Sequence, residues 1–142
     1  MTLTRRETLW LTAGAAAAAV LPIPAFASRP ETVEDAIAAF TGGAEVKKGG
    51  VDIGAPEIAE NGNTVPVEVS AAGATSIMLL AAGNPLPSVA TFNFGPLSAA
   101  SEAKTRIRLA KTQDLVAIAK MADGSFAMSR RAVKVTIGGC GG

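Results

Sequence analysis

Apolar residues recur at every second position in three segments of the chain, and this spacing restricts the fold more than any other feature. Val65, Val67 and Val69 alternate with other residue types, and the same period appears over 104–109 and 133–137. Successive side chains of a β-strand point to opposite faces, so each segment predicts a strand with one buried face. Less regular apolar runs predict further strands over residues 77–82, 89–94, 115–121 and 126–128.

Turn-forming residues separate the predicted strands at intervals of about ten residues, as an antiparallel sandwich requires. They are Asn61-Gly62-Asn63, Ala72-Gly73, Gly83-Asn84-Pro85, Gly95-Pro96 and Asp123-Gly124. The Asp-Gly pair predicts a β-hairpin. Because proline has no N–H to donate to a neighbouring strand, Pro66 predicts that its own strand lies at a sheet edge.

One segment has helical spacing instead. Val33, Ile37 and Phe40 lie on one face of a helix predicted over residues 30–40, and Gly42-Gly43 provides the stop. Taken together, the patterns predict an all-β, immunoglobulin-like antiparallel β-sandwich with a short N-terminal helix, in a single domain over residues 28–137.

Residues 1–27 have the pattern of a twin-arginine signal peptide. Thr4-Arg5-Arg6 precedes an apolar run from Leu9 to Leu21, and Ala25-Phe26-Ala27 is a small-residue cleavage site. The run is shorter than the roughly 20 residues that span a bilayer, so we expect no permanent membrane anchor. An uncleaved membrane helix is the alternative. A twin-arginine leader predicts export of the folded protein to a bacterial periplasm.

The charge balance excludes one class of partner. Removing the leader changes 13 basic and 12 acidic residues to 11 of each, a net charge near zero. Such a balance does not favour nucleic acid as a partner.

The chain ends with a cysteine between two pairs of glycines, Gly138-Gly139-Cys140-Gly141-Gly142. Glycine has no Cβ to restrict φ and ψ, so we predict that residues 138–142 form a flexible arm carrying a reactive thiol. The backbone from Ile137 to Cys140 can extend roughly 10 Å. A buried core cysteine is one alternative reading, and an intermolecular disulfide is another.

Nothing in the sequence near Cys140 would activate its thiol. The chain contains no histidine, and no lysine or arginine lies within five residues of the cysteine. A nucleophile without a base or a metal cluster is a poor catalyst. We therefore expect a carrier that partner enzymes activate, with no metal site and no cofactor.

The last ten residues, in which an alternating strand runs into GGCGG, resemble the signature of the SoxY family. Segments 41–43 and 56–63 and the leader are also similar to that family. The resemblance implies an immunoglobulin-like fold and a periplasmic sulfur carrier of thiosulfate oxidation. It implies that sulfur intermediates are attached covalently to Cys140, and that the chain forms a heterodimer with a SoxZ subunit. Two heterodimers could be linked by a disulfide through Cys140.

The resemblance also implies three enzymatic partners. A c-type cytochrome couples thiosulfate to the cysteine, a metal-dependent hydrolase releases sulfate, and a sulfane dehydrogenase oxidises the remaining sulfur.

Two other functions stay open from the residues alone. The terminal Gly141-Gly142 carboxylate could carry sulfur as a thiocarboxylate, although such carriers are cytoplasmic. Alternatively, the protein could be an exported structural or adhesive β-sandwich that is linked through its single cysteine.

Several further residues have a less specific interpretation. Six basic residues could form a patch for anions, but charges that alternate with apolar residues are more typical of the solvent face of a sheet. These are Lys104, Arg106, Arg108, Arg130, Arg131 and Lys134. Met78, Met121 and Met128 are predicted to fill the core, and Phe92 and Phe94 to lie in the core or at the SoxZ interface.

Overall fold

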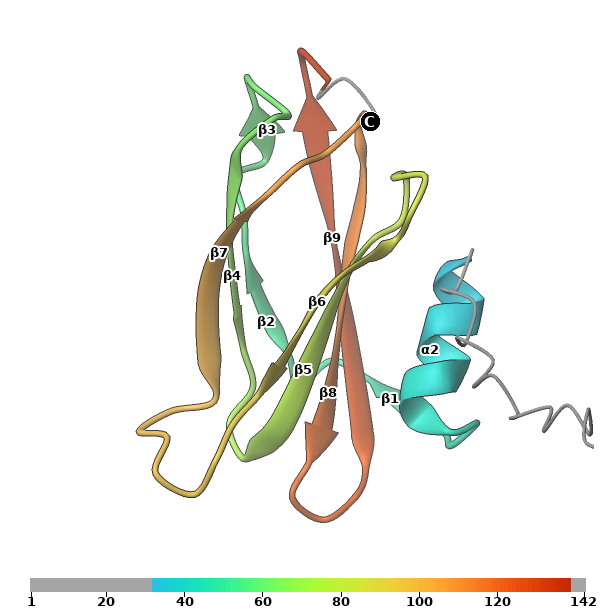
Figure 1. Ribbon diagram of the computed structural model, residues 1–142, viewed down its shortest axis with the longest axis vertical. Coiled ribbons are helices and arrows are strands. Elements are labelled where there is room, and N and C mark those ends of the chain that lie inside the picture. The colour runs from blue at the N-terminus through green and yellow to red at the C-terminus, as the bar shows by residue number, and fades with distance from the viewer. Residues whose placement is uncertain (1–31, 139–142) are drawn as a thin grey trace, which may run out of the picture.

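The structure, a computed structural model, describes residues 32–138 and consists of two packed β-sheets with one helix (Figure 1). The larger sheet has the strand order β1-β9-β8-β5-β6, with β3 also pairing to β9, and the smaller sheet has the order β2-β4-β7. The elements are α2 (Val33–Thr41), β1 (Val46–Lys48), β2 (Asp52–Gly54), β3 (Ile58–Ala59), β4 (Val65–Ser70), β5 (Ala74–Ala81), β6 (Ser88–Asn93), β7 (Glu102–Ile107), β8 (Gln113–Met121) and β9 (Phe126–Val135). The predicted all-β immunoglobulin-like sandwich with a short N-terminal helix is confirmed.

Most strand pairs are antiparallel, and the exceptions both involve β9. The short strands β1 and β3 pair with it in parallel, at its start and at its end. Neither they nor β2 were predicted, because a strand of two or three residues is too short to show a period.

Strands β5 and β8 lie in the middle of the larger sheet and are buried on both faces, which explains their continuous apolar sequences. Ile77, Leu79 and Leu115 pack into the interior of the sandwich. Leu80 and Ile118 point to the opposite face, which α2 covers (Figure 1). A strand with two buried faces has no polar alternation, so its sequence pattern is an apolar run.

Helix α2 is capped at both ends. The side chain of Thr32 accepts a hydrogen bond from the Asp35 N–H (3.1 Å), so the helix begins at Val33 and not at the predicted Pro30. Gly42 closes it in the left-handed region, as predicted. Phe40 packs edge-on against Phe126 of β9, with ring centroids 5.9 Å apart. In the part of the chain that the structure describes, no helix is long and apolar enough to cross a membrane.

The prediction that the strand of Pro66 lies at a sheet edge is wrong. Strand β4 is the central strand of the smaller sheet, between β2 and β7. However, β2 pairs only with residues 68–70 of β4. Pro66 therefore lies beyond the end of β2 and has no strand neighbour on that side, which makes its missing N–H tolerable.

The segments predicted as two C-terminal strands, 126–128 and 133–137, form the single strand β9. It ends at Val135, and Thr136 and Ile137 form a bend. The side chain of Ile137 is 68% exposed, so it does not continue the buried face to which Val133 belongs. The strand thus stops before the glycines instead of running directly into them.

The methionines and phenylalanines named above lie in or against the two cores. Met78 and Met128 contribute to the cluster beneath α2. Phe92, Phe94 and Met121 pack against the interior of the sandwich.

Candidate functional site: the end of the sandwich at which strand β9 ends

Strand β9 brings the chain to one end of the sandwich, where β3 and the segment after β7 also lie (Figure 1). Of the predicted site residues, the structure describes Gly138, which is exposed at this end. Gly139, Cys140, Gly141 and Gly142 lie outside the described residues, and so does the predicted leader over 1–27. The described part of the site therefore ends at Gly138, the root of the predicted arm.

The segment that contains β3 holds the last residues before the glycines on one side. The N–H of Thr136 donates to the Ala59 carbonyl (3.0 Å), and the Thr136 hydroxyl donates to the Glu60 carbonyl (3.0 Å). The carbonyl of Ile137 accepts from the N–H of Gly62 (2.8 Å), a buried residue. These bonds extend the attachment of the chain beyond the end of β9.

The segment between β7 and β8 holds the same residues on the other side. The hydroxyl of Thr112 accepts a hydrogen bond from the Val135 N–H (2.9 Å). At Gly138 the backbone passes so close to Ala110 that a Cβ would collide with the Ala110 carbonyl oxygen. The φ of Gly138 is not in the left-handed region. Glycine is therefore required by the lack of room for a side chain and not by the backbone conformation.

A network of side-chain amides ties these segments to the turn between β5 and β6. The Asn84 Oδ1 accepts from the Ala110 N–H and from the Gln113 Nε2, both at 2.9 Å, and the Asn84 Nδ2 donates to the Arg108 carbonyl (2.8 Å). The Gln113 Oε1 accepts from the N–H of Gly83 (2.7 Å). The network fixes the backbone on which Gly138 rests.

The sequence singled out Asn84 and Gly62 only as turn residues. Asparagine in a turn often bonds to nearby backbone, which is the signal that could have suggested this role. Its actual partners are 24 to 29 positions away, and no local pattern identifies them.

The six basic residues considered above do not form one patch. Lys104 and Arg106 belong to β7 in the smaller sheet, whereas Arg130, Arg131 and Lys134 belong to β9 in the larger one. Arg108 follows the end of β7 and is exposed, whereas Arg131 is half-buried.

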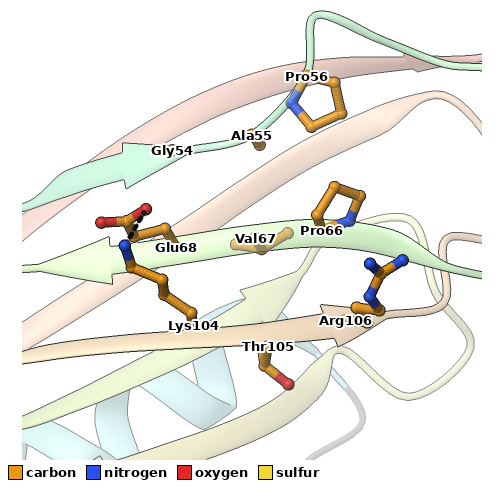
Figure 2. Close-up of a pocket in the computed structure, with 9 residues that line it drawn as sticks. All are labelled: Gly54, Ala55, Pro56, Pro66, Val67, Glu68, Lys104, Thr105 and Arg106. Atoms are coloured by element: carbon orange, nitrogen blue, oxygen red, sulfur yellow. Dashed lines mark ion pairs between the residues drawn. The ribbon is translucent and has the colours of Figure 1, made fainter.

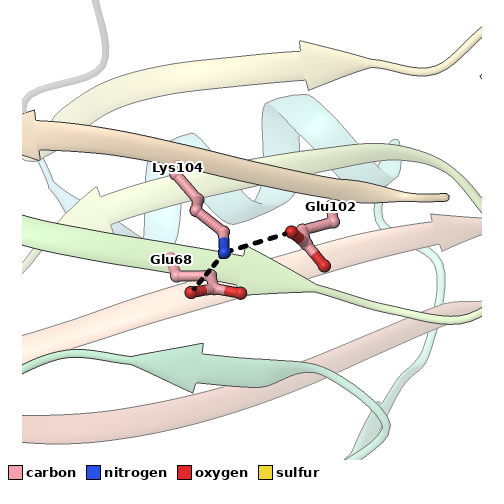
Figure 3. Close-up of polar contacts among 3 residues, drawn as sticks. All are labelled: Glu68, Glu102 and Lys104. Carbon is pink, nitrogen blue, oxygen red and sulfur yellow. Dashed lines mark ion pairs between the residues drawn. The ribbon is translucent and has the colours of Figure 1, made fainter.

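Lys104 lies in an ion cluster on the outer face of the smaller sheet. Its Nζ lies 3.3 Å from Glu68 and 3.4 Å from Glu102 (Figure 3). The hydrogen bond and charge of Glu68, and then those of Glu102, raise the pKa of Lys104. The Lys104 side chain is 66% exposed, so solvent screens the cluster and it contributes little to stability.

Glu68 and Lys104 also line a shallow groove of about 640 Å³. It runs across β4 at Pro66, with Pro56 on one side and Arg106 of β7 on the other (Figure 2). Within residues 32–138, no group of three or more acidic, cysteine or histidine side chains could hold a metal ion.

Comparison with known proteins gives a family. The family model of the sulfur oxidation protein SoxY matches residues 37–140. Among solved structures, the sulfur carrier protein SoxY from Chlorobium limicola f thiosulfatophilum is 40% identical, with 75% of this chain and 97% of that chain covered and a TM-score of 0.66. The comparison with curated proteins finds no significant match.

More distant structures share the fold alone. Superoxide reductase (neelaredoxin) from Ignicoccus hospitalis is 21% identical over 61% of this chain and 80% of that chain, with a TM-score of 0.54. A hypothetical protein from Pyrococcus horikoshii OT3 is 16% identical over 63% and 96%, with a TM-score of 0.52. The family match and the similarity to the Chlorobium protein agree with the resemblance seen in the C-terminal residues: this chain belongs to the SoxY family.

Proposed function

We propose that this protein is a sulfur carrier without catalytic activity of its own, which holds sulfur intermediates covalently on Cys140 while partner enzymes process them. The observation that carries the proposal is the family match, because it extends from residue 37 to Cys140 itself. The 40% identity to a protein described as a sulfur carrier supports the same role for this chain.

The geometry of the described residues is consistent with this role. Strand β9 ends at Val135, and the chain reaches Gly138 in an exposed position at the end of the sandwich. The chain therefore enters the predicted arm at the surface of the sandwich. Because the sequence has no histidine, the proposal assigns activation of the thiol to the partners.

Loading is an oxidation. The Cys140 thiol and thiosulfate form a new S–S bond, giving a cysteine S-thiosulfonate, one proton and two electrons. We assign the electrons to a c-type cytochrome, which accepts them one at a time. The cysteine sulfur and the sulfane sulfur of thiosulfate are the atoms that become bonded.

Unloading is a hydrolysis. Water attacks the terminal sulfone, the bond between that sulfur and the sulfane sulfur breaks, and sulfate and two protons leave. Cys140 keeps a persulfide anion, which a sulfane dehydrogenase would oxidise before a second hydrolysis. Covalent attachment keeps this reactive group from diffusing away and raises its concentration at each docked enzyme.

We also propose where the protein acts and with which subunit it pairs. The sequence of residues 1–27 supports export to the periplasm through the twin-arginine pathway. We assign a SoxZ subunit as the heterodimer partner, and the oxidising compartment would permit a disulfide between two heterodimers through Cys140. Periplasmic extraction followed by co-purification tests both assignments, and recovery of this chain alone from the cytoplasm would contradict them.

The experiment that tests the proposed chemistry is intact-mass analysis after incubation with thiosulfate and the partner enzymes, in the natural chain and in Cys140→Ser. We expect a thiosulfonate adduct that a reducing agent removes and that Cys140→Ser does not form. An adduct that persists in Cys140→Ser would instead favour the terminal carboxylate of Gly142. The absence of any adduct would favour a structural role for the cysteine.

A further inference from the structure

The root of the arm is more tightly held than its glycine-rich sequence suggests. A Cβ built on Gly138 would collide with the Ala110 carbonyl oxygen, whereas one on Gly95 or Gly124 would meet nothing within 4 Å. Gly138 is therefore a glycine that allows two backbone segments to touch, which is a different use from conformational freedom.

The surroundings of this contact are fixed by hydrogen bonds from both sides. The N–H of Gly62 donates to the carbonyl of Ile137, directly before Gly138, and the carbonyl of Gly62 accepts from the N–H of Leu109, directly before Ala110 (2.8 and 2.7 Å). Gly62 thus links the two segments that meet at Gly138. The side chain of Asn84 accepts a hydrogen bond from the Ala110 N–H and so holds Ala110 in place.

We propose that Gly138 is a positioning residue, whose contact with the Ala110 carbonyl fixes the root of the arm so that free movement begins at Gly139. The proposal rests on the function proposed above, because it gives this fixed root a role in presenting the Cys140 thiol.

The fixed root shortens the reach of the thiol. Cys140 is two positions after Gly138, which corresponds to at most about 7 Å of backbone. If the chain were free from the end of β9 at Val135, five residues would allow about 17 Å. A partner enzyme must then bring its reacting atoms close to this end of the sandwich, where the exposed side chains of Ile137 and Ile58 lie.

Measurement of backbone motion in the unaltered mature chain tests the proposal without a substitution. We expect an amide order parameter of about 0.8 at Gly138 and values below about 0.6 from Gly139 onward. A value at Gly138 as low as that at Gly139 would overturn the proposal. It would leave the sulfur-carrier function standing, since a longer mobile arm can also carry sulfur.

Gly138→Ala and Gly139→Ala form a matched pair for the functional consequence. We expect Gly138→Ala to increase hydrogen exchange at the Gly62 amide by about tenfold or more, because the added methyl pushes Ile137 away from its donor. It should also lower the rate of loading by the partner enzymes by about tenfold, while alkylation of Cys140 by iodoacetamide stays within about twofold. Gly139→Ala should leave exchange at Gly62 unchanged.

Equal exchange at Gly62 in both variants would overturn the fixed root, and equal loading rates would overturn its role in positioning. If neither variant nor the unaltered chain forms an adduct on Cys140, the proposed function fails, whatever the order parameters show.

Discussion

At the scale of single residues, Asn84 contributes most to holding together the end of the sandwich at which β9 ends. Its side-chain amide bonds to Arg108, Ala110 and Gln113, and so joins the turn after β5 to the segment that Gly138 touches. The bonds to Ala110 and Gln113 are partly buried, so water does not readily replace them.

Asn84→Ala is expected to lower the free energy of unfolding by about 1–3 kcal/mol, because it leaves the Ala110 N–H without its acceptor. Denaturant unfolding measures the change. Asn63→Ala is the matched control, since Asn63 is exposed and its side chain makes no hydrogen bond within the described residues; its effect should stay within about 0.5 kcal/mol. Equal losses in the two variants would contradict the role of Asn84.

A second residue-scale prediction concerns Asp123 in the hairpin between β8 and β9. The Ser125 hydroxyl (2.6 Å) and then the Ser125 N–H (2.8 Å) donate to its carboxylate and hold the pKa of Asp123 below its ordinary value of 3.8. Because the folded-state pKa is lowered, the stabilisation is present above the unfolded pKa and is lost as the pH falls through the lowered one. NMR titration of the Asp123 carboxyl carbon should show the lowered midpoint, and Ser125→Ala should return it toward 3.8. An unchanged midpoint in Ser125→Ala would show that the Ser125 hydroxyl does not cause the shift.

At the scale of elements, β5 serves two cores with alternate residues. Leu79 packs into the sandwich and Leu80 packs beneath α2, and both side chains are 0% exposed. The same sheet therefore holds the small sheet on one face and the helix on the other.

Leu79→Ala and Leu80→Ala are each expected to cost about 2–5 kcal/mol of unfolding free energy, because each leaves a cavity in a filled core. Their local effects should differ. Hydrogen exchange of the α2 amides should increase more in Leu80→Ala than in Leu79→Ala, measured at equal global stability by adjusting denaturant. The same exchange pattern in both variants would show that the two faces do not act separately.

At the scale of the whole molecule, the fold closes shortly before the predicted arm begins. Within residues 32–138, Ile137 makes the last backbone hydrogen bond, to Gly62, and Val133 is the last fully buried residue of β9. The described fold therefore ends at the start of the predicted arm.

Two truncations test this division. Removing residues 139–142 should change the free energy of unfolding by less than about 0.5 kcal/mol. Removing residues 136–142 also deletes the bonds of Thr136 and Ile137 to Ala59, Glu60 and Gly62, so it should cost about 2 kcal/mol or more. Denaturant unfolding of both chains decides the matter, and equal stabilities would place the end of the fold earlier than Thr136.

The patterns that the sequence shows clearly are those that a single element produces alone. The period of two at 65–69, the helical spacing from Val33 to Phe40 and the glycine stop at Gly42 all correspond to real elements. Two of the errors occur where neighbouring segments determine the structure. The position of β4 depends on how far β2 extends beside it, and the end of β9 depends on bonds from the segment around Ala59.

By itself, the sequence determined the class of fold, the family and the residue on which the proposed chemistry depends, since alternation, turn residues and the GGCGG end are local properties of the chain. Only the tertiary structure decided that Gly138 lies against Ala110, and that Asn84 and Gly62 hold that contact in place. The physical reason is that the close approach of two backbones is a relation between residues far apart in the chain. The sequence alone does not distinguish a glycine that provides conformational freedom from one that allows two backbones to touch.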